Sequence, residues 1–389
     1  MQSSSSGSPA FKVTVLSLAH MLNDWYMNFI QTLLPFLIAA GMQLTKGAFL
    51  VSIFTVSSSL IQPLAGYLVD QKNQRWMVYV GTLWMSILLS LAGLIENYLV
   101  FLVVVMLAGL GTAAFHPQAS AMVSSISGER KGFFQAMFMA GGNIGWALTP
   151  LMAVPVIERY GLHITPVFIV PGLVVAVMLY LYAPRTQSAA KKQSEPLWPV
   201  LREAGPELLK VVSVVAVRSL AYFGLIAFLP LYLQSQGIPL VSGSRMLFMM
   251  LFCGAMGGLI GGHLSDTWGR KTVIVGSLLL ATPLYYLFMH LGGGMSWISW
   301  VLLALAGMSL MSSFSVTTVI AQETISKNAA MAAGLMLGFS IGMGGLGVGL
   351  VGMLAESRGI PFAVNFLIWL PLVAALLGMT IKRRPVLKA

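Results

Sequence analysis

Two short stretches of the sequence share one pattern: GYLVD at residues 66–70 and GHLSD at residues 262–266. They lie 196 residues apart in a chain of 389 residues. In a membrane helix, glycine lets a neighbouring helix approach closely, and an aspartate at a helix end can face the positive N-terminus of another helix. Basic residues follow both copies: Lys72 and Arg75 after the first, Arg270 and Lys271 after the second. The spacing indicates a chain made of two similar halves.

The composition around this repeat is that of a membrane protein. Apolar residues make up 57% of the chain and charged residues only 8%, whereas soluble domains have roughly a quarter charged residues. The apolar residues form twelve segments: 13–40, 47–69, 76–95, 98–123, 132–157, 163–183, 208–236, 242–265, 272–290, 297–322, 329–355 and 360–381. Each segment is long enough to cross a hydrocarbon core about 30 Å thick as a helix, and the runs do not alternate as barrel strands do. We therefore expect an all-α polytopic membrane protein with twelve transmembrane helices in two pseudo-symmetric six-helix bundles, and we exclude soluble enzymes and disordered chains.

The longest predicted loop, residues 184–207, is rich in proline and charge. It is expected to be a cytoplasmic linker between an N-terminal bundle at residues 1–183 and a C-terminal bundle at residues 208–389. Of the 22 Lys and Arg residues, seventeen lie in or at the edges of the termini and the even-numbered loops, and four lie in or at the edges of the odd-numbered loops. The remaining cation, Arg218, lies inside a predicted helix. By the positive-inside rule, this asymmetry predicts both termini in the cytoplasm. The net charge of +11 is thus an orientation signal and does not indicate nucleic-acid binding.

Asp24 and Arg218 are the informative charges inside the predicted helices. A charge at the bilayer centre costs ~2.5–3.5 kcal/mol on insertion scales, so such a residue is a functional candidate. Counted along their helices, both lie near the midplane, and His20 lies one turn from Asp24 on the same face. Two interpretations stay open: a fixed pair that only joins the halves, or groups used in transport. His116, next to Pro117, is either a structural hydrogen-bonding residue or a proton carrier.

The second copy of the repeat extends to GHLSDTWGRK at residues 262–271. This resembles the loop motif of the major facilitator superfamily, approximately G-x-L-x-D-R-x-G-R-K, from which the first copy departs at Asn73 and Gln74. The resemblance implies a gating motif made of Gly66, Asp70, Arg75, Gly262, Asp266, Gly269, Arg270, Lys271 and Glu323. For Glu323, an ion pair with a loop cation such as Lys327 is an equal alternative to gating.

Within the superfamily, the sequence resembles the fosmidomycin resistance protein group. The shared pieces are His20 with Asn23-Asp24, Gln62-Pro63, Phe115-His116-Pro117, Gly141-Gly142-Asn143, Ala321-Gln322-Glu323 and the glycine run at 342–347. The resemblance implies a proton-driven efflux pump of the bacterial inner membrane that exports drug-like compounds, anionic phosphonates among them.

Several patterns that resemble other chemistry have simpler explanations. The run GMGGLG at residues 342–347 matches G-x-G-x-x-G, but no strand precedes it, so helix packing is the better interpretation. The sequence contains no P-loop, and none of its five histidines begins H-E-x-x-H. The single cysteine, Cys253, cannot form an internal disulfide. We expect no metal and no cofactor, and an intramembrane enzyme is the less favoured class of function.

We therefore expect a secondary transporter that exports small molecules in exchange for protons by alternating access. Proton-coupled uptake of a small metabolite shares this architecture and stays open. The proton-coupling candidates are Asp24, His20 and His116, and the substrate-binding candidates are Arg218, Asp24, Asn23, Trp25 and Asn143. The expected partners are a small-molecule substrate, protons and the lipid bilayer, for a monomer that binds no nucleic acid.

Overall fold

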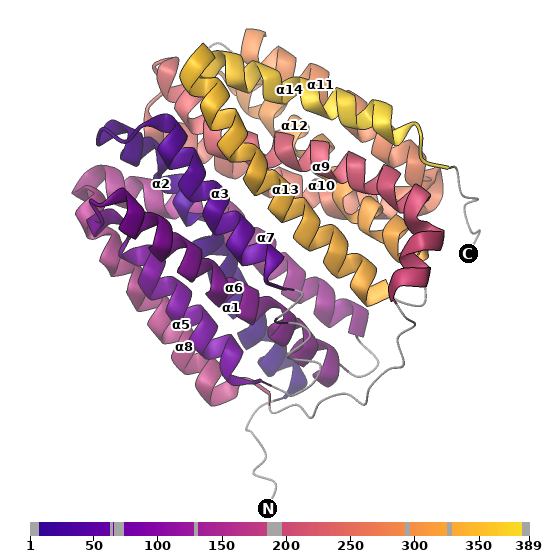
Figure 1. Ribbon diagram of the computed structural model, residues 1–389, viewed down its shortest axis with the longest axis horizontal. Coiled ribbons are helices and arrows are strands. Elements are labelled where there is room, and N and C mark those ends of the chain that lie inside the picture. Colours follow the sequence, from indigo (N-terminus) through magenta and orange to yellow (C-terminus); the bar gives the residue numbers. More distant parts are fainter. Residues whose placement is uncertain are drawn as a thin grey trace, which may run out of the picture. The chain divides into compact units, whose positions relative to one another are not determined.

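The computed structural model describes residues 8–62, 65, 74–127, 131–184, 197–291, 296–324 and 329–382, and all regular secondary structure in these ranges is helical (Figure 1). The first half contains α1 (Pro9–Met27), α2 (Phe29–Ala39), α3 (Leu44–Leu60), α5 (Trp76–Ser90), η1 (Ala92–Leu94), α6 (Tyr98–Ile126), α7 (Lys131–Tyr160), η3 (Leu162–Phe168) and α8 (Ile169–Tyr182). The second half contains α9 (Leu197–Ser235), α10 (Leu240–Trp268), α11 (Arg270–Leu291), α12 (Trp297–Thr324), α13 (Ala329–Arg358) and α14 (Ile360–Gly378).

The described residues contain ten helical segments that are long and apolar enough to cross a membrane. The two other predicted spans correspond to α1 together with α2, and to α3. α1 is less apolar than the others because it contains polar residues such as Asn23 and Asp24, and a break at Asn28 separates it from α2. The predicted all-α polytopic membrane fold is confirmed.

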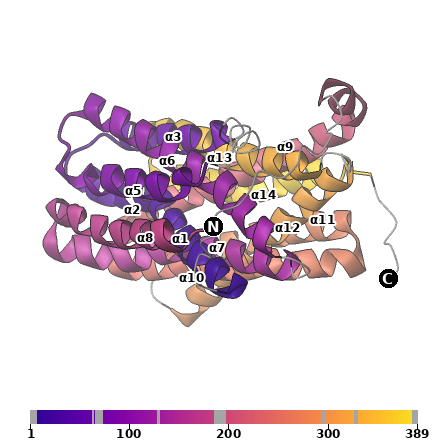
Figure 2. The same ribbon diagram turned by 90° about the horizontal axis from the view of Figure 1, so that it is seen from below.

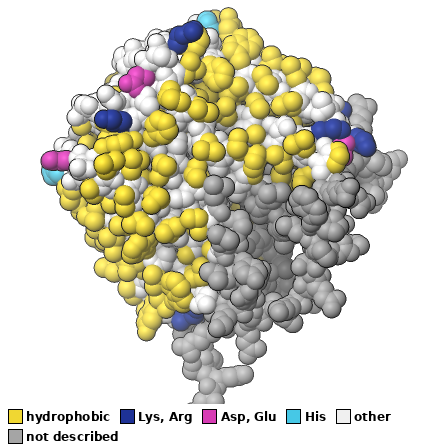
Figure 3. All heavy atoms as spheres, in the orientation of Figure 1, with side chains coloured by type: hydrophobic (Ala, Val, Ile, Leu, Met, Phe, Trp, Pro, Cys, Tyr) yellow, Lys and Arg dark blue, Asp and Glu magenta, His cyan; other side chains and the backbone are white. Residues whose placement is uncertain are grey.

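Large apolar side chains lie on the outside of the helices. Trp297 is 74% exposed and Leu99 is 70% exposed. On the face drawn in Figure 3, apolar side chains occupy most of the described surface, and charged side chains lie toward its edges. An apolar exterior of this extent suits lipid rather than water.

By their contacts, the residues group into two units. Unit 1 comprises residues 1–37 and 50–192, and unit 2 comprises residues 38–49 and 193–389. The sequence placed residues 38–49 in the N-terminal bundle, but this segment contacts α13: the backbone N–H of Thr45 donates to the Glu356 carboxylate over 3.0 Å. Gly352 leaves room for Ala48, whose Cβ would collide with a Cβ at position 352. The contacts therefore attach the start of α3 to unit 2.

In unit 1, α1 packs along α7 (Figure 2). Their backbones approach closely at Gly141 and Gly145, where an added Cβ would overlap the carbonyl oxygens of Ser17 and Met21. Small residues of this kind let membrane helices come together without a large side chain between them. This packing sets the position of the polar residues of α1.

In unit 2, α9 packs against α13 and α14, and α12 packs against α10 and α11. Glycines of the 342–347 run lie at the first of these contacts: a Cβ at Gly344 would collide with Phe223, and one at Gly347 with Leu220. The interpretation of this run as helix packing, and not as a nucleotide-binding loop, is confirmed.

The internal repeat reappears as a pair of equivalent contacts. Arg75, directly before α5, donates from its guanidinium to the carbonyl oxygens of Ala183, over 3.0 Å, and Tyr180, over 2.6 Å. Lys271, at the start of α11, donates to the carbonyl oxygen of Met379. Lys271 follows Arg75 by 196 residues, and Met379 follows Ala183 by 196 residues, the spacing of the two pentapeptides. In each unit, a cation therefore stabilises the negative C-terminal end of the last helix.

Candidate functional site

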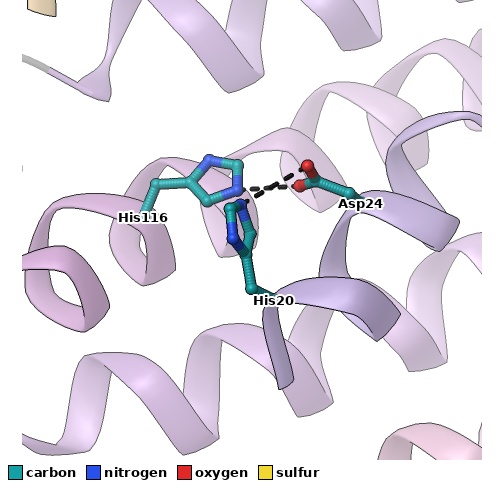
Figure 4. Close-up of side chains that lie close together, drawn as sticks. All are labelled: His20, Asp24 and His116. Carbon is teal, nitrogen blue, oxygen red and sulfur yellow. Dashed lines mark hydrogen bonds and ion pairs between the residues drawn. The ribbon is translucent and has the colours of Figure 1, made fainter. Parts of the chain in front are cut away.

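His20, Asp24 and His116 form a cluster inside unit 1 (Figure 4). Nε2 of His116 lies 2.9 Å from Oδ1 of Asp24, and Nε2 of His20 lies 3.4 Å from Oδ2 of the same carboxylate. The side chains of His20, Asp24 and His116 are 6%, 15% and 17% exposed, respectively. His20 and Asp24 lie next to each other, as the helical spacing predicted, and His116 of α6 contacts the same carboxylate.

His20 is fixed by α7. Its Nδ1 lies 2.7 Å from the carbonyl oxygen of Phe138, and its ring stacks on the Phe138 ring at 4.1 Å between centroids. Gly142, one turn further along α7, leaves space for the cluster, because a Cβ there would come within 2.6 Å of both Asp24 and His20. α7 thus orients one imidazole and supplies the free volume beside it.

The cluster matches a set of ligands that could hold a metal ion. Its two imidazole nitrogens and its carboxylate oxygen lie within 4.8 Å of one another. Two histidines with one carboxylate are also a known arrangement for divalent transition metals. The sequence predicted no metal here, and the direct contact between His116 and Asp24 already satisfies one carboxylate oxygen without an ion.

Three other predicted substrate residues of unit 1 lie in different surroundings. Asn23 is fully buried, and its Oδ1 accepts a hydrogen bond from Thr112 over 2.7 Å. Trp25 is buried and stacks on Phe29 at 5.2 Å. Asn143 is exposed on α7. The structure therefore places Asn23 and Trp25 within the packing of unit 1, apart from the partly exposed carboxylate of Asp24.

Arg218 lies in the interior of unit 2, where it is 1% exposed. Its guanidinium donates to Ser340 over 3.1 Å, to Thr317 over 3.3 Å and to Ser219 over 3.5 Å. Its Cζ lies 4.9 Å from the centroid of the Phe314 ring. None of the ion pairs found among the described residues involves Arg218.

Two tyrosines extend the polar surroundings of Arg218. Tyr222 lies one turn further along α9, near the guanidinium. Tyr285 of α11 lies near Tyr222, and its hydroxyl is buried without a hydrogen-bond partner among the described residues. The sequence did not show Tyr285, Thr317 or Ser340 as neighbours of Arg218, because they come from other helices of the half. Tyr222 lies one turn from Arg218 on the same helix, so helical spacing could have found it.

The predicted gating motif is described in its second copy. Arg270 contacts Asp266 over 2.5 Å and Glu323 of α12 over 3.2 Å. Glu323 thus pairs with Arg270. Lys327, the alternative cation, lies outside the described residues, as do Gly66 and Asp70 of the first copy.

Two glycines of the motif have identifiable roles. Gly269 joins α10 to α11 with a φ of 90°, a conformation that favours glycine. Gly262 faces Ser315 of α12, where an added Cβ would lie 3.3 Å from the serine hydroxyl.

The sequence profile of the Major Facilitator Superfamily matches residues 16–346 of this chain. The chain belongs to the major facilitator superfamily. The members that it resembles are transporters, and this protein is a multi-pass membrane transporter and not an enzyme.

Two curated relatives span most of the chain. The fosmidomycin resistance protein of Escherichia coli (strain K12) is 32% identical over 380 residues, which cover 93% of this chain and 90% of that protein. The uncharacterized MFS-type transporter YfnC of Bacillus subtilis (strain 168) is 30% identical over 377 residues, with the same coverage. The predicted resemblance to the fosmidomycin resistance protein group is confirmed.

Solved structures show the same fold at low sequence identity. A bacterial homolog of the human lysosomal transporter Spinster, in an inward-facing and unoccupied conformation, superposes with a TM-score of 0.80 at 16% identity, covering 96% of both chains. A point mutant of the nucleoside transporter NupG superposes with a TM-score of 0.76 at 14% identity, covering 96% of this chain and 100% of that one.

Proposed function

We propose that this transporter exports small, anionic, drug-like molecules in exchange for protons. In this proposal, Arg218 binds an anionic group of the substrate, and the cluster of His20, Asp24 and His116 binds the proton. The protein works as a monomer in the bacterial inner membrane, with both termini in the cytoplasm, as the distribution of its Lys and Arg residues favours.

The main observation behind the proposal is that Arg218 is buried and has no carboxylate partner among the described residues. A buried charge costs several kcal/mol unless it is paired, and neutral hydroxyls offset only part of that cost. In unit 2, the guanidinium has hydroxyl partners and an aromatic ring but no carboxylate among the described residues. Guanidinium groups bind carboxylates, phosphates and related anions through paired hydrogen bonds. An anionic substrate would therefore supply the missing charge.

Proton coupling is supported by the cluster in unit 1. In this cluster, the carboxylate of Asp24 contacts the imidazoles of His20 and His116. Histidine is the side chain whose ordinary pKa lies nearest physiological pH, and a neighbouring carboxylate stabilises its charged form. Such groups inside transmembrane helices mark proton pathways in many transporters. Export, rather than uptake, is supported by the relatives, which include a fosmidomycin resistance protein and, at 31% identity over 36% of the chain, a multidrug resistance protein, MdtG.

Transport into inverted membrane vesicles tests the direction and the driving force. Radiolabelled fosmidomycin is the probe, and an imposed pH difference, acidic inside, should drive its accumulation in the vesicles. Accumulation in right-side-out vesicles instead, with protons and substrate moving together, would favour proton-coupled uptake. Absence of any response to the pH difference would contradict proton coupling in either direction.

Binding to purified protein tests the role of Arg218 separately. Arg218→Ala should weaken fosmidomycin binding about 10- to 100-fold, the range expected for a lost hydrogen-bonded charge. Arg245→Ala is the matched control, because Arg245 is an exposed arginine of the same unit, and it should leave binding unchanged. Equal affinities of the Arg218→Ala variant and the wild type would remove Arg218 from the substrate site.

A further inference from the structure

The carbonyl oxygen of Phe138 determines which nitrogen of His20 can exchange a proton. Carbonyl oxygens only accept hydrogen bonds, so Nδ1 of His20 must carry a hydrogen to make its 2.7 Å contact. This holds for both the neutral and the charged ring. Nε2 is therefore the one ring atom that can gain or lose a proton while the contact to Phe138 persists.

Nε2 of His20 faces an acceptor. It lies 3.4 Å from Oδ2 of Asp24, and in a neutral ring its lone pair would point toward a negatively charged oxygen. The other carboxylate oxygen, Oδ1, lies 2.9 Å from Nε2 of His116. Because an ionised carboxylate only accepts hydrogen bonds, this nitrogen is the donor when Asp24 is ionised. The cluster thus has a donor for Oδ1 and lacks one for Oδ2.

The groups around His20 determine the net charge beside the gap between its Nε2 and Oδ2 of Asp24. Asp24 faces it from α1, His116 and Phe115 face it from α6, and Phe138 stacks on it from α7. None of the ion pairs among the described residues brings a Lys or Arg to Asp24. One added proton makes the cluster neutral, as an imidazolium beside a carboxylate, and its loss leaves a net negative charge in the interior.

We infer that the exchanged proton is held on Nε2 of His20, in the gap between that nitrogen and Oδ2 of Asp24. This inference deepens the proposed function and rests on it. The lone pair of Nε2 accepts a proton from water, and the same N–H bond breaks when the proton returns to water after the change of access. Asp24 supplies the charge that stabilises the imidazolium, and His116 orients Asp24. Because Asp24 and His116 are more exposed than His20, the proton reaches Nε2 past their side chains.

Nitrogen NMR on the full-length protein tests the proton site without measuring transport. The chain has five histidines, so the signals of His20 in ¹⁵N-histidine-labelled protein in lipid can be assigned by their loss in a His20→Asn variant. On acidification, Nε2 of His20 should change from unprotonated to protonated, while Nδ1 stays protonated throughout. A His20 ring that does not change protonation, or that changes at Nδ1, would overturn the inference even if transport proved to be proton-coupled.

The His20→Asn variant also tests proton binding at position 20 independently of the hydrogen bond to the Phe138 carbonyl oxygen. The asparagine amide occupies the position of Nδ1 and can donate to the Phe138 carbonyl, but it has no atom that takes up a proton. We expect accumulation driven by the pH difference to fall to passive equilibration, with fosmidomycin binding within about twofold of wild type. His163→Gln, at an exposed histidine of the same unit, is the matched control and should transport normally. Normal pH-driven accumulation by His20→Asn would show that the proton is carried elsewhere.

Discussion

Single residues of α7 and α9 set the chemistry of the two units. Gly142 is buried beside the carboxylate and imidazole of the cluster, where it provides space rather than a functional group. Arg218 is the opposite case, a long charged side chain held in place by hydroxyl groups. Both residues matter through what surrounds them, so their substitution should change function more than it changes the fold.

Gly142→Ala should impair proton coupling. The new Cβ would lie 2.5 Å from Oδ2 of Asp24 and 2.6 Å from Nε2 of His20, so it would push these two groups out of their present contact. Accumulation in vesicles under a pH difference measures the effect, which should be a loss of at least about tenfold, as expected when a proton-transfer group is misplaced. Gly276→Ala is the control, because nothing lies within 4 Å of a Cβ at that helical position. Comparable transport by both variants would show that the space beside Gly142 is not needed.

Removal of metal ions should leave transport intact. The cluster has the ligand types of a metal site, but the proposed mechanism needs only protons. Vesicles prepared and assayed with EDTA should accumulate substrate at the rate of untreated vesicles. A loss of transport that added Zn²⁺ or Co²⁺ restores would replace the proton mechanism with a metal-dependent one.

At the scale of elements, the chain uses cations to fix helix ends. The contacts of Arg75 with the end of α8 and of Lys271 with the end of α14 are equivalent under the 196-residue repeat. Resemblance to the superfamily motif implied gating for both residues, and their contacts show an additional structural role. The interruption at Asn28, whose amide donates to the Trp146 carbonyl over 2.9 Å, similarly ties the bend between α1 and α2 to α7.

Arg75→Ala and Lys271→Ala should each lower thermal stability. Each removes a charged donor from helix-end carbonyls, a loss of about 1.5–3 kcal/mol that corresponds to a fall of several degrees in Tm. Since the two residues lie in different units, the effects in the double variant should be additive within about 0.5 kcal/mol. Unfolding in detergent, followed by intrinsic fluorescence, provides the measurement. Arg245→Ala, at an exposed arginine near the start of α10, is the control. An equal loss of stability in this variant would show that the helix-end contacts of Arg75 and Lys271 do not stabilise the protein.

At the scale of the whole molecule, the features that depend on local composition and spacing could be predicted from the sequence. Span length and the 196-residue repeat were sufficient for the all-α membrane fold, and i,i+4 spacing was sufficient for the pair of His20 and Asp24. The contact of His116 with Asp24 joins residues 92 positions apart, and the hydroxyls around Arg218 come from α12 and α13. Such contacts depend on how helices rotate and pack, which hydropathy does not encode. For the same reason, the attachment of residues 38–49 to unit 2 was not foreseen.

The orientation of the molecule in the membrane can be tested by labelling. In a Cys253→Ala background, single cysteines at Lys46 and Arg358 should react in intact cells with a thiol reagent that does not cross membranes. A cysteine at Thr267, beside the basic motif, should react only after the membrane is opened. All three positions are exposed, so burial does not limit the reaction. The reverse labelling pattern would place both termini outside the cytoplasm.

The attachment of residues 38–49 to unit 2 has a consequence for engineering. Gly41 is an exposed glycine with a φ of 94°, the kind of loop position where added sequence is normally tolerated. Here the loop precedes Thr45, whose N–H is held by Glu356. An epitope tag or reporter domain inserted at Gly41 would pull on this hydrogen bond and on the packing of Ala48 against Gly352. Reporter insertions intended to be silent therefore belong elsewhere, since this exposed turn lies where the chain passes from one unit to the other.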